Sequence, residues 1–316
     1  MLHLSGMGGG TFHSRHPGKI GRFEQGTPEY ERLFTDYLRQ LESHFREKGW
    51  LDKSYIYWFD EPEPKDYEFV RDGMERIHRA APGLRRMLTE QPEKELDGAV
   101  DIWCPLTPTI TPEIVAGERA KGREMWWYIC TGPKGPYCTL FIDHYAIEFR
   151  MWSWQTWKTG VQGLLIWQTN YWTSDVAFPS PQIQNPWEDP MSYVSGYSTP
   201  VGTKKHWGNG DGRFIYPPNR DPERDKNKYL VGPVNSIRWE MLREGIEDYE
   251  YFWLLRELVE RAKKRGEKSD GITRAEALLK IPDSITRDQT HFTHDPLDLY
   301  RYRAALAEAI VALMRK

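Results

Sequence analysis

The chain has 316 residues, with 43 basic and 46 acidic side chains and a formal net charge of −3. This length is enough to bury a large hydrophobic core, as one large domain or two smaller ones. The near balance of charges excludes a global field that would attract nucleic acid or an anionic membrane, and we expect neither as a partner.

Aromatic residues are the outlier of the composition, with 14 Trp and 17 Tyr. Tyr and Trp present flat apolar faces with a polar tip, and the C–H-rich faces of sugars stack on such surfaces. Carbohydrate is therefore the first substrate class to consider, although most of these side chains are expected to fill the core.

Cysteine and histidine usage gives no sign of a disulfide framework, a metal or a cofactor. The cysteines are odd in number and share no repeated spacing. They are Cys104, Cys130 and Cys138. The N-terminal histidines, His3, His13 and His16, have no acidic or Cys partner at ligand spacing. Residues 1–6 lack the charged and apolar regions of a signal peptide, which leaves the compartment open.

Strands alternate with helices over the first half of the chain. The pattern predicts five strands, at 54–59, 85–89, 100–104, 124–130 and 163–168, with room for a sixth near the N-terminus. It predicts helices at 28–48, 65–80, 112–121 and 143–160. Such alternation indicates a parallel sheet with right-handed crossovers, for which the (β/α)8 barrel of TIM type is the best-known case. Because eight strands are needed, the chain forms either an incomplete barrel or an open sheet.

The second half changes character at residue 173. Residues 173–230 are dense in Pro, Gly, Asn, Ser and Asp, which is typical of a lid or binding loop or of a disordered segment. A short strand is expected at 213–217, the longest helix at 236–264, and further helices at 272–280 and 296–314. We therefore predict a barrel-type catalytic domain over 1–262 and C-terminal helices over 263–316 packed on it.

Two adjacent carboxylates, Asp60 and Glu61, follow the aromatic strand at 54–59 directly. Acids at the carboxyl end of an apolar strand are where α/β enzymes place their chemistry. The alternative is that they cap the following helix, since acids suit a helix N-terminus. We favour catalysis, because capping does not explain why a bulky strand leads up to an adjacent pair.

Six groups of residues occur in the order of a known family. They are Trp58–Pro62, Trp127–Tyr128, Arg150 with Trp154, Gly163–Trp167, Gly210–Gly212 with Tyr216–Pro217, and Ser236–Arg238 with Arg243–Tyr251. Over about residues 50–262 the chain resembles the catalytic domain of glycoside hydrolase family 123, the β-N-acetylgalactosaminidases, and its relatives of unknown function.

This resemblance implies a retaining glycosidase that cleaves terminal β-linked N-acetylgalactosamine with help from the substrate's own 2-acetamido group. Asp60 and Glu61 then map to the end of the fourth barrel strand. The family's N-terminal β-sandwich and first strands are absent, so a missing N-terminal segment or a homo-oligomer would complete the barrel. Members are often secreted or periplasmic, and the expected partner is a glycan that contains N-acetylgalactosamine.

The adjacency of the two acids fits this mechanism. A retaining enzyme with two catalytic carboxylates needs them about 5 to 5.5 Å apart across the scissile bond. Neighbours along a strand point to opposite faces, so Asp60 and Glu61 are poorly placed for that arrangement. In the family mechanism Asp60 would orient the acetamide N–H and stabilise the oxazolinium, and Glu61 would be the general acid and base.

Further candidates for substrate binding lie at later strand ends and in a glycine turn. They are Tyr128, Trp167, Asn170, Trp172 and Asp211. Trp172 is a candidate floor under the sugar and Tyr128 a donor to the acetamido oxygen, but such residues equally pack the top of a barrel. Asp211 either binds sugar hydroxyls or makes a local Asx-turn.

Two alternatives to a β-N-acetylgalactosaminidase remain open from the sequence. The same acids would serve a β-N-acetylglucosaminidase or a related hexosaminidase. A non-catalytic carbohydrate-binding fragment is the other, because half of the barrel is absent.

Overall fold

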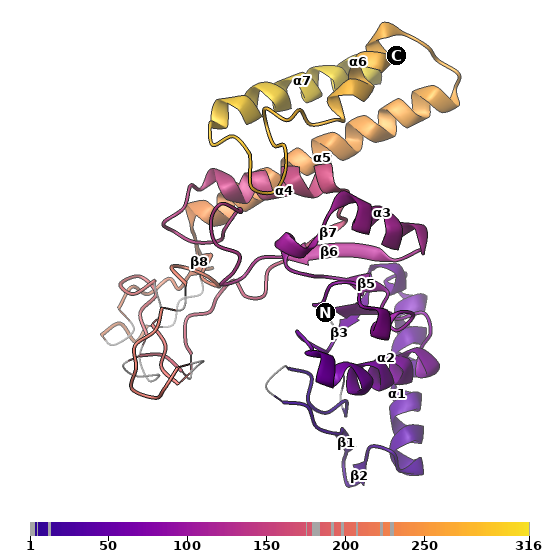
Figure 1. The fold of residues 1–316 in the computed structure, drawn as a ribbon, viewed down its shortest axis with the longest axis vertical. Helices are drawn as coiled ribbons and strands as arrows, with labels where there is room; N and C mark the ends of the chain where they lie inside the picture. The colour runs from indigo at the N-terminus through magenta and orange to yellow at the C-terminus, as the bar shows by residue number, and fades with distance from the viewer. Residues whose placement is uncertain are drawn as a thin grey trace. The chain divides into compact units, whose positions relative to one another are not determined.

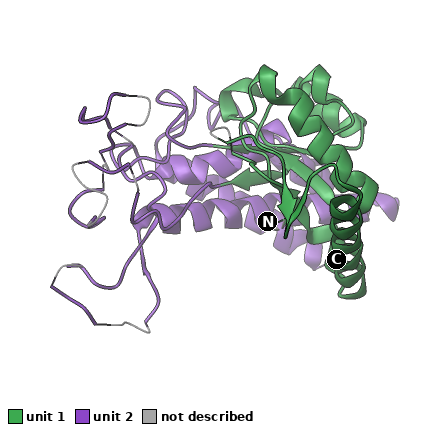
Figure 2. Ribbon diagram, turned by 90° about the horizontal axis from the view of Figure 1, so that it is seen from below, with its two compact units in different colours: residues 1–128, 161–165 green, residues 129–160, 166–316 purple. Residues whose placement is uncertain are grey.

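The computed structural model describes residues 4, 6–11, 14–174, 176–178, 184–190, 193–196, 199–206, 208–221, 224–227 and 231–315. The chain forms two compact units, which Figure 2 shows in two colours. Unit 1 comprises residues 1–128 and 161–165, and unit 2 comprises residues 129–160 and 166–316. His3 and His13 lie outside the described residues, as do parts of the 173–230 segment.

Unit 1 is built on a five-stranded parallel sheet (Figure 1). Its strands are β3 (Tyr55–Tyr57), β4 (Arg85–Leu88), β5 (Ile102–Trp103), β6 (Glu124–Tyr128) and β7 (Gly163–Leu165). They pair in chain order, β3-β4-β5-β6-β7, and every pair is parallel. The five predicted strands are therefore confirmed. Among the described N-terminal residues no sixth strand joins this sheet, and Gly10 accepts a backbone hydrogen bond from Asp60.

The helices of unit 1 follow the sequence signals closely. They are α1 (Pro28–Glu47), α2 (Tyr67–Ala80) and α3 (Pro112–Ala120), and an antiparallel hairpin of β1 (Lys19–Ile20) and β2 (Phe23–Glu24) precedes them. Thr27 and Thr111 cap α1 and α3 by accepting a hydrogen bond from a backbone N–H, and each of these two helices begins with proline. Short 3-10 turns lie at Leu51–Lys53, Pro64–Asp66, Lys94–Leu96 and Thr107–Thr109. The turn at Pro64–Asp66 explains why α2 starts later than the predicted residue 65.

Unit 2 is mainly helical. It contains α4 (Ile147–Thr159), α5 (Ile237–Lys264), α6 (Asp270–Leu278) and α7 (Pro296–Met314), with an antiparallel pair of β8 (Ile215–Tyr216) and β9 (Val234–Asn235). Helix α5 packs against both α4 and α7. At Gly245 of α5 a Cβ atom would lie 3.0 Å from Cα of Arg150, so the missing side chain permits a close crossing with α4.

A buried ion pair joins α4 to α5. Arg150 Nε donates to Asp248 Oδ2 at 2.5 Å, Trp154 Nε1 donates to the same oxygen at 2.7 Å, and both charged side chains are fully buried. Arg303 of α7 lies 3.4 Å from Asp248 and pairs with Glu244 at 2.7 Å. These contacts fix α5 between its two neighbours.

The predicted boundary after residue 262 falls inside α5. Because α5 packs with α4 and α7 in one compact unit, the contacts divide the chain at other positions. A catalytic domain over 1–262 stays a prediction. In the part of the chain that the structure describes, every helix is too short or too polar to cross a membrane.

Candidate active site

The acid pair lies where β3 has ended and the chain turns away from the sheet. Phe59 is buried, and Gly73 of α2 leaves room for its ring, because a Cβ atom there would lie 2.3 Å from Phe59 Cζ. Glu61 has φ of +39°, a left-handed conformation that is uncommon for a residue with a side chain. Backbone strain of this kind is concentrated at functional sites.

Two hydroxyl groups hold the Asp60 carboxylate. The Tyr57 hydroxyl donates to Asp60 Oδ1 at 2.5 Å, and Thr89 Oγ1 donates to the same oxygen at 2.8 Å. Thr89 Oγ1 also accepts from the backbone N–H of Glu61 at 3.0 Å. Burial and the charge of Asp60 raise the pKa of Tyr57 far above its usual range, so Tyr57 stays a donor. Thr89 therefore joins both acids to the end of β4.

Glu61 is half-buried and accepts a hydrogen bond from a tyrosine. The Tyr128 hydroxyl, at the end of β6, donates to Glu61 Oε1. Burial raises the pKa of Glu61, the charge of Asp60 adds to this effect, and the hydrogen bond from Tyr128 opposes it. A raised pKa is what a general acid needs near neutral pH.

Arg15 anchors the backbone of this turn. Its guanidinium donates to the carbonyl oxygens of Asp60, at 2.6 Å, and of Gly10. Its Nε lies 3.6 Å from Asp66 Oδ2, so its charge is directed at Asp66. The Asp60 carboxylate thus receives hydroxyl donors, and Arg15 fixes the main chain beneath it.

Three residues of this arrangement escaped the sequence analysis: Tyr57, Thr89 and Arg15. Thr89 is the last residue of the strand predicted at 85–89, so its position at a strand end was a usable signal. Tyr57 lies within the aromatic strand, and nothing in the sequence distinguishes it from the other aromatic residues there. Arg15 acts from 45 positions away along the chain, and nothing in its local sequence indicates this contact.

The other predicted site residues lie in unit 2, and two of them form a pair. Trp167 Nε1 donates to Asp211 Oδ1 and Oδ2 at 3.1 and 3.2 Å, and Asp211 is fully buried. Burial raises the pKa of Asp211 to about 6, while the hydrogen bond from Trp167 opposes the rise. Gly212, with φ of +71°, lets the chain pass close to the Trp167 ring. Asp211 therefore orients the Trp167 indole, and a direct contact of Asp211 with a sugar stays a prediction.

Trp172 and Asn170 are held separately. Trp172 Nε1 donates to the backbone oxygen of Ile215 in β8 at 2.9 Å, and the Trp172 side chain is half-buried. Asn170 is exposed, and its Oδ1 accepts from Gln168 Nε2 at 2.9 Å. Both side chains are thus oriented, and their contact with a substrate stays a prediction.

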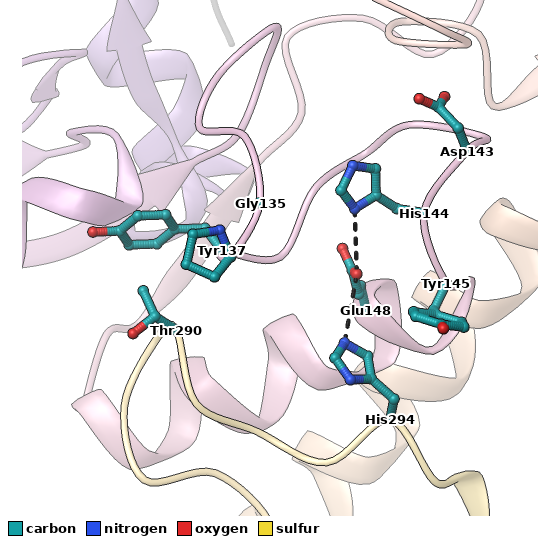
Figure 3. A pocket seen from close by; sticks show the side chains of 9 residues that line it. Gly135, Tyr137, Asp143, His144, Tyr145, Glu148, Thr290 and His294 are labelled. Atoms are coloured by element: carbon teal, nitrogen blue, oxygen red, sulfur yellow. Dashed lines mark ion pairs between the residues drawn. The ribbon is translucent and has the colours of Figure 1, made fainter.

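Unit 2 also contains a cavity of about 600 Å³ that none of the predicted site residues line (Figure 3). Its central feature is the buried carboxylate of Glu148. Glu148 Oε1 lies 3.5 Å from His144 Nδ1 and 3.7 Å from His294 Nε2, with the two rings on opposite sides of it. Glu148 Oε2 accepts from the backbone N–H of Thr139 at 2.9 Å. Among the described residues, no group of three or more His, Cys, Asp or Glu could hold a metal ion.

Comparison with known proteins shows which class of enzyme the sequence belongs to. The catalytic-domain model of glycoside hydrolase 123 matches residues 14–255, which makes this chain one of the glycoside hydrolases by sequence. Because the match spans most of the chain, the chain belongs to glycoside hydrolase family 123. No curated protein sequence matches it.

One solved structure supports the fold. It is a family 123 glycoside hydrolase from Clostridium perfringens, described for the hydrolysis of glycolipid glycans, with a TM-score of 0.52 and 17% sequence identity. The similarity covers 94% of this chain and 46% of that chain, so the present chain corresponds to about half of its length. At this identity the likeness shows the fold alone.

Proposed function

We propose that this chain carries the acid pair of a retaining β-N-acetylgalactosaminidase that uses substrate-assisted catalysis. The observation that carries the proposal is that the two adjacent carboxyls have different hydrogen-bond partners. Asp60 is an acceptor held by two hydroxyl donors, and Glu61 is an acid of raised pKa that accepts from Tyr128. Family 123 membership supports the same chemistry.

In the first step the substrate's 2-acetamido oxygen attacks the anomeric carbon, and the bond from that carbon to the leaving oxygen breaks. Glu61 gives its proton to the leaving oxygen and becomes a carboxylate. Asp60 accepts the acetamide N–H and stabilises the positive oxazolinium that forms. Since Tyr57 and Thr89 both donate to Oδ1 of Asp60, Oδ2 is the oxygen we assign to the N–H.

In the second step the Glu61 carboxylate takes a proton from water, and the water oxygen attacks the anomeric carbon. The oxazolinium ring opens, the acetamide is restored, and Glu61 is again an acid. Because the anomeric carbon is inverted twice, its configuration is retained. The Tyr128 hydroxyl, which can donate to one acceptor at a time, is assigned to the acetamido oxygen when the sugar is bound.

The architecture that we infer for the working enzyme is a (β/α)8 barrel of TIM type, with the five parallel strands as part of it. The carboxyl edge of such a sheet is where barrel enzymes bind substrate. Trp167 and Trp172 are the proposed stacking surfaces for the sugar. The glycan of a glycolipid, named for the clostridial relative, is the first natural substrate to try.

The test is turnover of an aryl β-N-acetylgalactosaminide by the parent protein and by Glu61→Gln. Losing a positioned acid is expected to lower kcat by about 10²- to 10⁴-fold. Azide should partly restore turnover of an activated aryl glycoside in Glu61→Ala, because the azide anion attacks the anomeric carbon in place of water, needs no base and forms the glycosyl azide. Unchanged turnover in Glu61→Gln would end the assignment of Glu61.

Two further measurements address the sugar and the route. Comparing aryl glycosides of N-acetylgalactosamine and N-acetylglucosamine determines the 4-hydroxyl preference. A thiazoline mimic of the oxazolinium is expected to inhibit the parent and to bind Asp60→Asn more weakly. Failure of the mimic to bind the parent would contradict substrate assistance.

A further inference from the structure

The cavity of unit 2 has a size and a lining that suit a small ligand. Its volume of about 600 Å³ lies within the range of small-molecule pockets. Tyr137 and Tyr145 contribute aromatic rings to its lining, and Glu148, His144 and His294 contribute its central polar groups (Figure 3). None of these side chains belongs to the acid pair or to the groups that hold it, so the candidate active site does not account for this cavity.

The carboxylate of Glu148 is fixed through one of its two oxygens. Glu148 lies in the first turn of α4 and is 3% exposed. Its Oε2 accepts from the backbone N–H of Thr139 at 2.9 Å and from the Thr139 hydroxyl at 3.4 Å. Its Oε1 lies 3.5 Å from His144 Nδ1 and 3.7 Å from His294 Nε2. Both distances exceed the usual length of an N–H···O hydrogen bond, about 2.7–3.2 Å, so Oε1 has room for a ligand.

Both imidazole rings are held by neighbours other than Glu148. The His294 ring packs against Tyr145 and Phe292, with ring centroids 4.8 and 4.9 Å apart. A Cβ atom at Gly135 would lie 3.4 Å from His144 Cε1, so the edge of the His144 ring lies close to the Gly135 backbone. The two rings therefore have defined positions on opposite sides of the carboxylate.

The loop that carries His294 is anchored to the helix that carries Glu148. Lys158 of α4 donates to the backbone oxygens of Ile281 and Thr286. Because these contacts exist without a ligand, the polar groups are preorganised and little ordering is needed on binding.

A hydroxyl oxygen fits between Glu148 Oε1 and each imidazole nitrogen. Hydrogen bonds to a hydroxyl are about 2.7–3.0 Å long, so one hydroxyl can bridge two atoms that lie 3.5 or 3.7 Å apart. The hydroxyl donates to the carboxylate and accepts from an imidazole N–H. An ammonium group has only donors and cannot use the imidazole N–H groups in this way. The arrangement thus favours two neighbouring hydroxyls over a cation.

We propose that this cavity binds a sugar ring through two adjacent hydroxyls, held between Glu148 and the imidazoles of His144 and His294. Tyr145 is 66% exposed and Tyr137 is half-buried, so both rings can stack on the C–H face of the sugar. The bound unit is a sugar other than the one cleaved at the acid pair. A carbohydrate ligand agrees with membership of family 123, and the inference does not depend on the mechanism proposed for the acid pair.

The test is a titration with methyl β-galactopyranoside, followed by NMR on protein labelled with ¹⁵N at histidine. The imidazole signals of His144 and His294 are assigned by their loss in His144→Phe and His294→Phe. We expect both signals to shift with a dissociation constant of about 1 mM, as suits a ligand of this size. The signal of His78, exposed on α2, should stay in place. The compound 2-(hydroxymethyl)tetrahydropyran keeps the ring but has no adjacent hydroxyl pair, and it should shift neither signal.

Two variants test the polar groups, with binding read from the histidine signals that remain. Glu148→Gln removes the charged acceptor, and His294→Phe removes an N–H while it keeps a ring against Tyr145 and Phe292. Each should weaken binding by about tenfold or more, because a hydrogen bond of the charged site is lost. His78→Phe is the matched control and should bind like the parent. Thermal unfolding shows which variants fold, and His294→Phe decides if Glu148→Gln does not.

Two outcomes would overturn the inference. One is the absence of any shift of the His144 and His294 signals at about 100 mM galactoside, where a site of this affinity is filled. The other is an equal shift with the tetrahydropyran, because the hydroxyl pair would then not be recognised.

The titration is also independent of the proposed function. The same shifts are expected in Glu61→Gln and in the presence of the thiazoline mimic, which occupies the proposed active site. Shifts without hydrolysis would refute the proposed function and keep this sugar site. Hydrolysis without shifts would refute the sugar site and keep the proposed function.

Discussion

Asp248 in unit 2 and Asp60 in unit 1 are held by opposite means. Asp248 is fully buried and accepts from Arg150 and Trp154, with Arg303 3.4 Å away. Asp60 accepts from the hydroxyls of Tyr57 and Thr89, and no cation among the described residues pairs with its carboxylate. Cations cancel a charge and serve the fold, whereas hydroxyls fix the direction of a carboxylate and leave its charge for a ligand. The comparison separates an aspartate that stabilises the fold from one that we propose to act in catalysis.

The largest effect is expected where the charge is cancelled. Asp248→Ala leaves Arg150 buried without its partner and should lower the free energy of unfolding by about 3–5 kcal/mol. Chemical denaturation measures this directly. The isosteric Asp248→Asn keeps an acceptor for Trp154 and should cost less. If Asp248→Ala lowers the free energy of unfolding by less than about 1 kcal/mol, the Arg150–Asp248 pair is no stronger than a surface ion pair. The contrast between Asp248 and Asp60 would then not hold.

Asp211 sharpens the comparison, because it is buried like Asp248 but held by a neutral indole. Its pKa is about 6 in the folded protein and about 3.9 when unfolded, so between these values the folded state binds more protons. Stability contributed by this group is therefore present below pH 4 and lost as pH rises to 6, by up to about 3 kcal/mol. Asp211→Asn should remove this pH dependence from unfolding curves. Asp36→Asn, on the exposed face of α1, should retain it.

Thr89→Val tests the hydroxyl clamp on the acid pair. It removes the donor to Asp60 and the acceptor for the Glu61 N–H, while the volume is kept. Losing these bonds is expected to lower kcat/KM on an aryl β-N-acetylgalactosaminide by about 10- to 100-fold, which corresponds to about 1.4–2.7 kcal/mol. Thr89→Ser keeps the hydroxyl and should retain most activity. Equal activity of the valine and serine variants would show that the clamp does not matter for catalysis.

The smallest effect is expected from Tyr57→Phe. Thr89 still donates to Asp60 and still accepts from the Glu61 N–H, so one hydrogen bond to the carboxylate is lost, worth about 1.5 kcal/mol or roughly 12-fold in kcat/KM. Tyr55→Phe, on the same strand, is the control and should match the parent. A larger loss in Tyr57→Phe than in Thr89→Val would reverse the order of the two hydroxyls.

The sequence predicted the elements and the acid pair for a common reason, which is that local chemistry determines both. The aromatic run ending at Phe59 predicted a strand, and the helices predicted from residues 28 and 236 begin at Pro28 and Ile237. The contacts that distinguish Asp60 from a helix cap depend on strand register and on Arg15, and they could not be predicted locally.

The helix α4 was predicted, but the elements that it packs against could not be predicted from the sequence, for another reason. Its residues Ile147–Thr156 are all buried, so the helix has no polar face that indicates which neighbour it packs against. The structure places it against α5 and Asp248. This packing places α4 and α5 in one compact unit.

The route of the chain through its two units has a practical consequence. The main chain leaves unit 1 after Tyr128, returns for Val161–Leu165, and leaves again. A truncated protein that stops at Tyr128 would lose β7 and present β6 as a bare edge, a template for association with other chains. Neither half can thus be produced by cutting the polypeptide once, and a rearranged chain order that splices Val161–Leu165 onto the first half would be required to study it in isolation.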